Sequence, residues 1–478
     1  MNLEEVLKEF WKSWNSKIGV SFLTMIIILS IYVAVTYPWD FGLRVWNNPS
    51  YWADNPKAVP PDWTRYFVNE KIPPNLVYDF DKPTFIEFSR GMKTMNYVAE
   101  IDYSYDLPPS FISITIRNVT YYTSKPPTLE IIFERPDDLS ETLTTLIIKP
   151  PRTGETPPYR KYVESPSKIF LSGDPQVLSV MANAIENRYG VRLSLDEAAR
   201  IGLEKLMFGK PVGNEFGILT GTYRLIMKVK CFDQRDDVEN VKMVIGGRVY
   251  GLLGTDTLGR DLAIGLMFGF PIALIIGIVS SLLTTMIGSM MGIVSGYMGG
   301  KIDMGIQRLC DILVNIPLLP ILIFFTSILG SSAPKLIIIL AVLIAFSWPG
   351  LAIVIRPMIL QIKSGEFIEA TIALGASKRR IIFKHIFPQV APFIFAQMIF
   401  FTPSAILAEA ALSFLGLGDP SIPTWGQILE YGFRCGALYL GYWWWVLPPG
   451  LLIVFSAITF VLIALGLEPV ISPRLRRR

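Results

Sequence analysis

Six apolar runs, each about 20 residues long, constrain the fold of this chain more than any other feature. A helix needs about 20 apolar residues to cross roughly 30 Å of hydrocarbon, and lipid offers no hydrogen-bond partners to other backbone conformations. Of the 478 residues, 51% are hydrophobic and only 18% are charged. We therefore predict an all-α polytopic membrane protein with six transmembrane helices. The predicted spans are residues 18–37, 268–297, 312–329, 336–355, 392–412 and 443–467.

Lysine and arginine gather on one side of these spans. They precede the first span, lie between the second and third and between the fourth and fifth, and end the chain: Lys8, Lys12, Lys17, Lys301, Arg308, Lys363, Lys378, Arg379, Arg380, Lys384, Arg474, Arg476, Arg477 and Arg478. The other connections hold Lys335 and Arg434. Since short cytoplasmic loops are enriched in basic residues, we predict a multi-pass cell-membrane protein with both termini cytoplasmic.

Residues 1–38 combine an amphipathic helix with the first span. Leu3, Phe10 and Trp14 share one helical face, whereas Glu4 and Lys8 avoid it, which is typical of a helix lying on the inner leaflet. The following apolar run is longer than that of a usual signal peptide, and no Ala-x-Ala site follows it. We therefore predict a membrane anchor.

Residues 39–250 hold no spanning run and are long enough for a core of their own. Apolar alternation and apolar runs predict strands at 112–116, 129–133 and 143–148, and a last strand pair at 223–229 and 241–244. One helix is predicted from Asp174 to a stop at Gly190, and a second from the Ser194–Glu197 capping box to Gly209. We expect a large inserted extracytoplasmic α+β domain without a catalytic constellation. Asn118 begins an N-glycosylation sequon.

The polar connection between the fourth and fifth spans has a helix–glycine–helix–proline pattern. Its candidate site residues are Glu366, Phe367, Glu369, Ala370, Gly375, Ala376, Arg379, Arg380 and Pro388. Glycine suits the joint because it adopts positive φ at low cost. The pattern predicts two short helices forming a rigid knob that another protein can grip; the alternative is an ordinary charged surface loop.

Three further segments stand at the opposite ends of the spans. Asp256, Arg260 and Asp261 precede the second span, where they can pair and cap a helix start. Glu409 is the one carboxylate inside a span, and its position favours hydrogen bonding to the adjacent loop over ion coupling. Glycines 292, 296, 299 and 300 permit either close helix approach or a turn.

These segments together resemble the C-type permease subunit of the dipeptide, oligopeptide and nickel ABC importers. The similarity is loose over residues 1–60 and close over 250–478. It includes Gly254–Asp261, Glu409–Gly418, Pro423–Gly426 and the terminal Leu467–Arg476. The connection at 366–388 resembles the EAA coupling loop, with Thr371 in place of the second alanine. The long 39–250 insert departs from the family, whose connection there is short.

The resemblance implies an ABC type I importer permease fold, with a transmembrane domain at 251–467 and a basic cytoplasmic tail at 468–478. It also implies half of a translocation pathway for di- and oligopeptides delivered by an external binding protein. The implied partners are a homologous second permease in a heterodimer, two ATP-binding subunits that grip the coupling loop, and the lipid bilayer. No nucleic acid is implied, and the net charge of +4 suggests none.

The chain contains no Gly-x₄-Gly-Lys-Ser/Thr sequence, so we predict a non-enzymatic subunit whose partner ATPases use ATP and Mg. No cofactor or metal is expected, since His385 is the single histidine and the three cysteines lack a Cys-x-x-Cys spacing. A disulfide between Cys231 and Cys435 is a low-ranked alternative to free thiols. Rival functions are oligosaccharide import by the same machinery, an ion-coupled secondary transporter, and a membrane-anchored enzyme.

Overall fold

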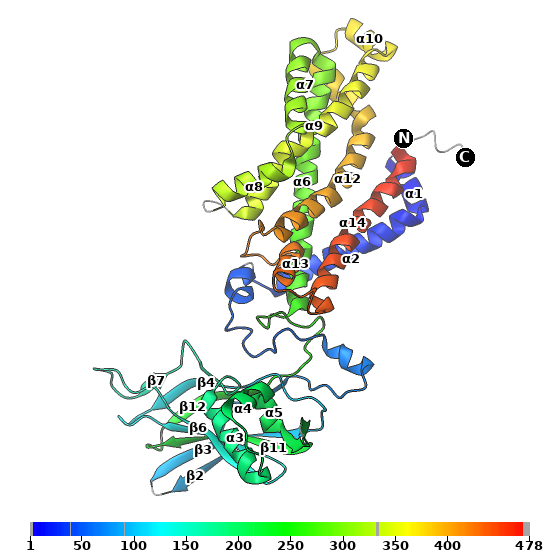
Figure 1. The fold of residues 1–478 in the computed structure, drawn as a ribbon. Helices are drawn as coiled ribbons and strands as arrows, with labels where there is room; N and C mark the ends of the chain where they lie inside the picture. The colour runs from blue at the N-terminus through cyan, green and yellow to red at the C-terminus, as the bar shows by residue number, and fades with distance from the viewer. Residues whose placement is uncertain (1–2, 39, 90, 214, 331–333, 472–478) are drawn as a thin grey trace. The chain divides into compact units, whose positions relative to one another are not determined.

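The computed structural model describes residues 3–38, 40–89, 91–213, 215–330 and 334–471. It divides into two compact units, Met1–Asn48 with Leu262–Arg478 and Pro49–Asp261 (Figure 1). The inserted unit thus runs from 49 to 261 rather than from 39 to 250. Residues before Pro49 belong with the helices because Gly42 packs directly against the backbone of Ser421. Residues after 250 belong with the insert because Thr255 donates from Oγ1 to Pro56 O at 2.8 Å.

The first unit is entirely helical in its described residues. Its elements are α1 (Leu3–Lys12), α2 (Trp14–Thr36), the π-helix η1 (Gly42–Trp46), α6 (Leu262–Met298), α7 (Gly300–Val314), α8 (Leu318–Leu329), α9 (Lys335–Lys363), α10 (Glu366–Ala373), α11 (Lys378–Ile381), the π-helix η3 (Ile382–Ile386), α12 (Phe387–Phe414), α13 (Trp425–Arg434) and α14 (Trp443–Ile471). Five of the described helical stretches are long and apolar enough to cross a membrane. They contain α2, α6, α9, α12 and α14. The first residues of the predicted basic tail, 468–471, belong to α14, and residues 472–478 lie outside the described part of the chain.

The predicted third span is not one straight helix. Helices α7 and α8 are bent by 81° at a short break, so the described chain has six spans only if this pair is counted as one. The prediction of a continuous helix over 312–329 is therefore wrong. Pro317 has no N–H to donate to the preceding turn, and the Asn315 side chain donates to Asp311 O at 2.6 Å, which ends α7 there. Hydropathy alone does not register such a break.

Helix α6 lies at the centre of this unit and contacts α2, α9 and α12. Its closest neighbour is α9, because Gly288, Gly292 and Gly296 leave no side chain between the two backbones. A Cβ atom added at these three glycines would lie 2.7, 2.9 and 2.8 Å from the carbonyl oxygens of residues 348, 352 and 356. Gly299 and Gly300 instead have φ of +66° and +58° and form the turn into α7. Of the four glycines singled out in the sequence, Gly292 and Gly296 thus permit close helix approach, whereas Gly299 and Gly300 form a turn.

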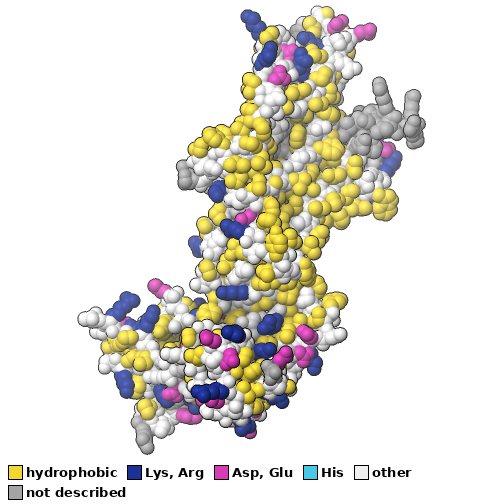
Figure 2. Space-filling view, viewed as in Figure 1, with side chains coloured by type: hydrophobic (Ala, Val, Ile, Leu, Met, Phe, Trp, Pro, Cys, Tyr) yellow, Lys and Arg dark blue, Asp and Glu magenta, His cyan; other side chains and the backbone are white. Residues whose placement is uncertain are grey.

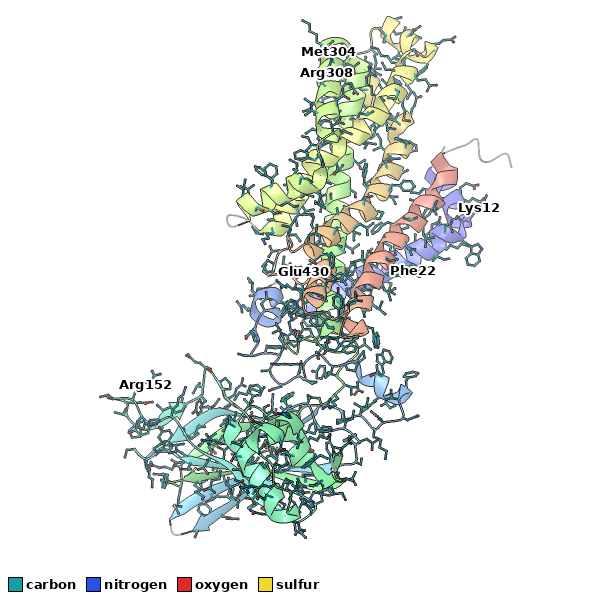
Figure 3. All side chains as sticks on the ribbon, in the orientation of Figure 1. Lys12, Phe22, Arg152, Met304, Arg308 and Glu430 are labelled. Carbon is teal, nitrogen blue, oxygen red and sulfur yellow. The ribbon has the colours of Figure 1, made fainter. Side chains whose placement is uncertain are left out.

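Helices α2 and α14 pack together on the other side of the unit. Phe22 (labelled in Figure 3) meets Phe455 with ring centroids 4.8 Å apart. Gly19 lies against Ile463, and Gly466 against Ser16. On the face drawn in Figure 2, hydrophobic side chains cover the helices, and charged side chains gather at the end that carries α7 and α10. This distribution is the one expected of helices that meet lipid along their length and water at their ends.

The second unit contains the chain's strands. These are β1 (Leu76–Phe80), β2 (Phe85–Ser89), β3 (Met92–Tyr103), β4 (Ile112–Tyr121), β5 (Thr128–Glu134), β6 (Ser140–Ile147), β7 (Tyr159–Lys161), β8 (Ser167–Phe170), β9 (Gly209–Val212), β10 (Glu215–Ile218), β11 (Gly221–Cys231) and β12 (Asp237–Ile245). One sheet has the order β1-β12-β4-β7, with β8 also paired to β4, and the other has the order β2-β3-β11-β5-β6. All recorded pairings are antiparallel, and β9 and β10 form a separate hairpin.

Both predicted helix starts of this unit are confirmed. Helix α3 (Pro175–Tyr189) has Asp174 as its N-cap and ends at Gly190 with φ +70°. Helix α4 (Leu195–Ile201) has the Ser194–Glu197 capping box. The second helix does not run unbroken to Gly209, because Gly202 at φ +89° separates α4 from α5 (Leu203–Phe208). A short 3₁₀ helix, η2 (Asp62–Phe67), precedes the strands.

The predicted pairing of the last two strands is wrong. Strand β11 pairs with β3 and β5, whereas β12 pairs with β1 and β4 in the other sheet. The turn between them is organised by the buried carboxylate of Asp236, which accepts hydrogen bonds from the backbone N–H groups of Phe232, Asp233 and Tyr122. The chain therefore crosses between sheets here. The apolar faces of both sheets and the helices α3 to α5 share one core.

Substitutions of two glycines test the α6–α9 contact. Gly292→Ala places a methyl group against the α9 backbone and should destabilise the helical unit by about 1–3 kcal/mol, as overpacking of interiors does. Gly350→Ala is the matched control, because Gly350 is helical with open space around its Cβ position. It should be neutral or stabilising by up to about 1 kcal/mol. Thermal unfolding of the purified chain in detergent measures both, and equal midpoints would contradict the close contact.

Candidate functional site

The connection between α9 and α12 forms a compact knob of short helices. Helix α10 ends at Ala373 with Leu374 as its C-cap, and Gly375 turns the chain with φ +80° and open space at its Cβ position. Ser377 then caps α11, its Oγ accepting a hydrogen bond from Arg380 N at 3.4 Å. Pro388 lies in the first turn of α12. The helix–glycine–helix–proline pattern thus folds as two short helices on either side of a left-handed glycine.

The inner face of the knob is apolar and buried. Ile368, Ile381 and Ile386 are at most 1% exposed. They pack in one cluster with side chains of α6 and α9, among them Ile293 and Ile355. Full burial of an isoleucine side chain is worth about 1.5–3 kcal/mol, so three such anchors hold the knob firmly. The knob is therefore fixed to the ends of α6 and α9.

The outer face of the knob carries large apolar side chains that nothing in the described chain covers. Leu374 is 88% exposed, Phe383 66% and Phe367 62%. The Phe367 and His385 rings lie edge to face, with their centroids 5.4 Å apart. The sequence-predicted site residues Glu366, Phe367, Glu369, Ala370, Gly375, Arg379, Arg380 and Pro388 are all exposed, whereas Ala376 is half-buried. An apolar centre with a charged rim is the usual composition of a protein-binding surface.

An ion pair fixes the helices that carry the knob. Arg356 of α9 donates from Nε and Nη2 to the two carboxylate oxygens of Asp303 in α7, both at 2.6 Å. Ser295 of α6 donates to the same carboxylate at 2.5 Å, and Lys363 donates to Tyr297 O at 2.9 Å. The network joins α6, α7 and α9 just before α10 begins. Sequence reasoning missed it; the signal was an arginine placed among apolar residues directly after a predicted span.

The remaining predicted residues fall in both units. In the Pro49–Asp261 unit, Asp256 is fully buried and accepts hydrogen bonds from the backbone N–H groups of Leu258 and Arg260 at 2.8 and 2.9 Å. The Arg260 side chain donates from Nε to the Asp256 carboxylate at 2.5 Å. The backbones of Asp261 and Thr255 form an isolated antiparallel β-bridge. The carboxylate organises a turn instead of capping the first residue of α6. Its partners account for its burial without any ligand.

In the helical unit, Glu409 joins α12 to the segment before α13. It accepts hydrogen bonds from Ser413 at 2.6 Å and from Thr424, the N-cap of α13. The next residue, Trp425, donates from Nε1 to Leu266 O of α6 at 2.7 Å. Glu409 and the Pro423–Gly426 segment therefore lock α12, α13 and α6 together. This is hydrogen bonding to the adjacent loop, which the sequence favours over ion coupling.

Cys231 gives no support to a disulfide with Cys435. Its side chain is 1% exposed in the core of the second unit. Burial raises the pKa of the Cys231 thiol to about 12, which keeps it protonated and unreactive. A bridge to another part of the chain would require opening that core.

Spanning helices in close contact, joined by a rigid knob with an uncovered apolar face, define a membrane-embedded subunit built to work with a second protein. Residues 285–477 match the family described as binding-protein-dependent transport system inner membrane component. The dipeptide transport system permease protein DppC of Bacillus subtilis (strain 168) is 35% identical over 225 residues, 47% of this chain and 69% of the relative. The oligopeptide transport system permease protein OppC of Escherichia coli (strain K12) is 36% identical over 222 residues, 46% and 72% of the two chains. OppC of Haemophilus influenzae is 34% identical over 226 residues, 47% and 71%.

The chain belongs to this family of transport-system membrane components, and it is a permease subunit of an ABC importer. The resemblance to C-type permeases is thereby confirmed. More than half of the chain lies outside each of the three matches.

Neutralising the carboxylate of Asp303 tests the ion-pair network. Asp303→Asn should destabilise the helical unit by about 1.5–3 kcal/mol, the usual range for a hydrogen bond to a charged group. Asp311→Asn is the control, since it is an exposed carboxylate on the same helix without an ion pair among the described residues. Arg356→Gln combined with Asp303→Asn should cost little more than either change alone. Additive losses in thermal unfolding would contradict a direct pair.

Proposed function

We propose that this permease forms half of the translocation pathway of an ATP-driven importer of di- and oligopeptides. The printed names of the related proteins, which are dipeptide and oligopeptide transport permeases, support the substrate class. The other half of the pathway is a homologous second permease, and an external binding protein delivers the peptide. The protein lies in the cell membrane with both termini cytoplasmic, as the distribution of lysine and arginine predicts.

The observation that carries the proposal is the knob formed by α10, α11 and η3. We infer that a cytoplasmic ATPase binds its outer face, with Leu374, Phe367 and Phe383 entering a groove of that partner. Since this chain has no P-loop sequence, ATP and Mg are bound by the two partner ATPases. Closure of the ATPases on ATP would then push the knob, and the knob would turn α6 and α9 with it.

Oligosaccharide import by the same machinery is the closest alternative, and only the cargo differs. An ion-coupled transporter has less support, because the one carboxylate within a predicted span, Glu409, is engaged by Ser413 and Thr424. Uptake measured in proteoliposomes with the purified binding protein, competing labelled peptides against oligosaccharides, separates the first two. Uptake driven by an ion gradient without ATP would overturn the proposal.

Replacing the most exposed apolar residue of the knob tests the docking surface. Leu374→Ser should weaken ATPase binding about tenfold or more, because burial of a leucine is worth about 1.5–3 kcal/mol. Leu438→Ser is the matched control, an exposed leucine after α13 and outside the knob. Both variants should fold normally, since neither side chain contributes to the core. The measurement is ATPase affinity and ATP-driven uptake side by side; equal affinities for the two variants would refute the assignment.

We further propose that the Pro49–Asp261 unit enlarges the surface on which the binding protein docks. Its sheets can be removed cleanly, since Leu76 and Ile245 are paired at the ends of β1 and β12 and Gly247 N donates to Asn75 Oδ1 at 3.2 Å. Replacing residues 76–245 with a short Gly-Ser linker should weaken binding-protein affinity and leave assembly with the ATPases unchanged. Titration of the binding protein against the full and the trimmed complex checks this. Unchanged affinity and unchanged uptake would assign the unit another role.

A further inference from the structure

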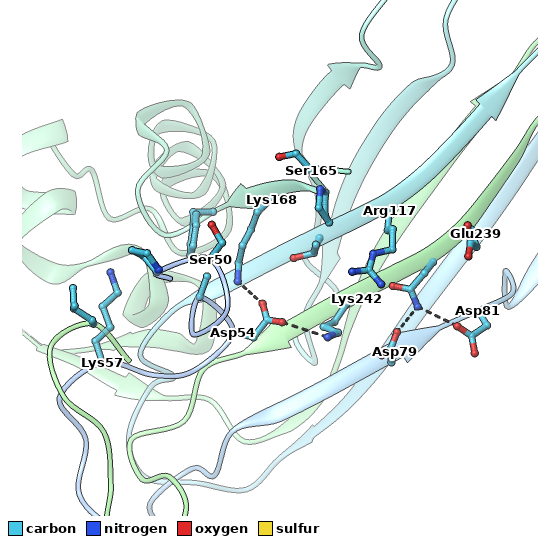
Figure 4. Close-up of a pocket in the computed structure, with 17 residues that line it drawn as sticks. Ser50, Asp54, Lys57, Asp79, Asp81, Arg117, Ser165, Lys168, Glu239 and Lys242 are labelled. Carbon is cyan, nitrogen blue, oxygen red and sulfur yellow. Dashed lines mark hydrogen bonds and ion pairs between the residues drawn. The ribbon is translucent and has the colours of Figure 1, made fainter. Parts of the chain in front are cut away.

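The Pro49–Asp261 unit contains a groove on the solvent side of the β1-β12-β4-β8 sheet (Figure 4). Its volume is about 640 Å³, within the roughly 300–1,000 Å³ of known small-molecule sites. The segment from Pro49 to Lys57 forms one wall. All of the residues that line it belong to this one unit.

The floor of the groove follows from strand alternation. In β4, Ile112, Ile114 and Ile116 enter the core, so Thr115 and Arg117 face the opposite side. The register places Asp79, Lys242, Thr115 and Lys168 in one row across β1, β12, β4 and β8. Asn240 and Arg117 pair in the next row.

Positive charge collects at one end of the groove. Lys168 and Lys242 both pair with the single carboxylate of Asp54, Lys242 at 3.4 Å, so two cations share one anion. Lys57 lies nearby (Figure 4) and has no ion pair among the described residues. Burial lowers the pKa of Lys168, and Asp54 opposes that effect. This end carries an excess of positive charge even after Asp54 is counted.

Negative charge collects at the other end. Asp79 and Asp81 both accept hydrogen bonds from the neutral amide of Asn240, at 2.6 and 3.1 Å. Glu239 accepts one from the side-chain amide of Asn118. An amide orients a carboxylate but leaves its charge uncompensated. Arg117, paired in register with Asn240, also lies at this end (Figure 4), and this one arginine against the three carboxylates leaves the end anionic. Figure 4 shows these acids together and away from Lys57 and Lys168.

Two further residues of the groove are uncharged. The Thr115 hydroxyl oxygen is buried in the floor of the groove and has no hydrogen-bond partner among the described residues. Phe170 is 46% exposed at the lysine end and supplies an apolar wall. A bare anion would use the lysines only, and a metal ion the acids only. A ligand with an ammonium at one end and a carboxylate at the other uses the whole groove.

We propose that this groove binds short peptides with free termini, the carboxylate near Lys168 and Lys242 and the ammonium near Asp79 and Asp81. Three strand spacings of about 4.8 Å separate β1 from β8, and an extended peptide covers about 3.5 Å per residue. The span of roughly 14 Å therefore fits about four residues. The choice of a peptide among zwitterions rests on the proposed function. The permease would then hold cargo at a site of its own outside the helical unit.

Calorimetric titration of the full chain in lipid nanodiscs with tetra-alanine tests the proposal. The free peptide should bind, and either N-acetylation or C-amidation should weaken binding about tenfold, or about 1.4 kcal/mol. Equal affinity for the doubly blocked peptide, or no binding of the free peptide, overturns the proposal. Inorganic phosphate should not compete at the concentration at which it would saturate a simple anion site; full competition by phosphate also overturns it.

Two variants assign the ends. Lys242→Gln should weaken binding of the free peptide but leave the already weak binding of its C-amide unchanged, and it leaves Lys168 to pair with Asp54. Asp81→Asn should weaken binding of the free peptide but leave the already weak binding of the N-acetyl peptide unchanged. The controls are Lys210→Gln on β9 and Glu87→Gln on β2, exposed residues of equal charge that do not line the groove. Variants that affect blocked and free peptides alike contradict the assignment.

ATP-driven uptake by the complete transporter separates this proposal from the proposed function. If the transporter takes up peptide but the isolated chain binds none, the groove proposal is refuted and the proposed importer function stands. If the isolated chain binds peptide in the groove but the transporter shows no ATP-driven peptide uptake, the proposed importer function is refuted and the groove proposal stands.

Discussion

The close contact of α6 with α9 is the interaction on which the rest of the helical unit depends. Gly288, Gly292 and Gly296 let the two backbones meet without intervening side chains. Association of helices in lipid has little hydrophobic driving force and relies on such packing. The contact brings Arg356 to Asp303 and sets Ile355 and Ile359 beside Ile293. Those same isoleucines form the floor on which the knob lies, so the position of the knob is set within the bundle.

A knob anchored in this way is fixed to the helices that carry it and is not a hinged flap. Its inner face is buried against two spanning helices, and the Asp303–Arg356 pair ties a third helix to them. The glycine of the knob, Gly375, adopts a left-handed conformation in the turn that separates α10 from α11. A push on the exposed face is therefore transmitted to α6 and α9 together.

The sequence predicted the features that local chemistry determines. The capping box at Ser194, the left-handed stop at Gly190 and the glycine joint at Gly375 each depend on a few neighbouring residues, and each is found in the structure. The features it missed depend on distant partners. The chain's crossing from one sheet to the other at Asp236 needs Tyr122, more than a hundred positions away. The Arg356–Asp303 pair joins helices separated by α8, and the bend at Pro317 lies inside an apolar run that hydropathy treats as uniform.

The inserted unit shows how a permease can gain a large domain without altering its helices. Its entering and leaving segments run together from the start: Asn55 donates to Gly259 O at 2.9 Å, Ala58 N to Asp256 O at 2.7 Å and Asp62 N to Gly251 O at 2.9 Å. The segments stay paired as far as β1 and β12, so the unit enters and leaves through one narrow stem. Helices α2 and α6 on the other side of that stem contact each other directly. A connection that returns to its starting point places no constraint on its own length, because each sheet closes its hydrogen bonds internally. Under the proposed function, the surface of this unit is free to vary with cargo, whereas the knob must keep fitting an ATPase.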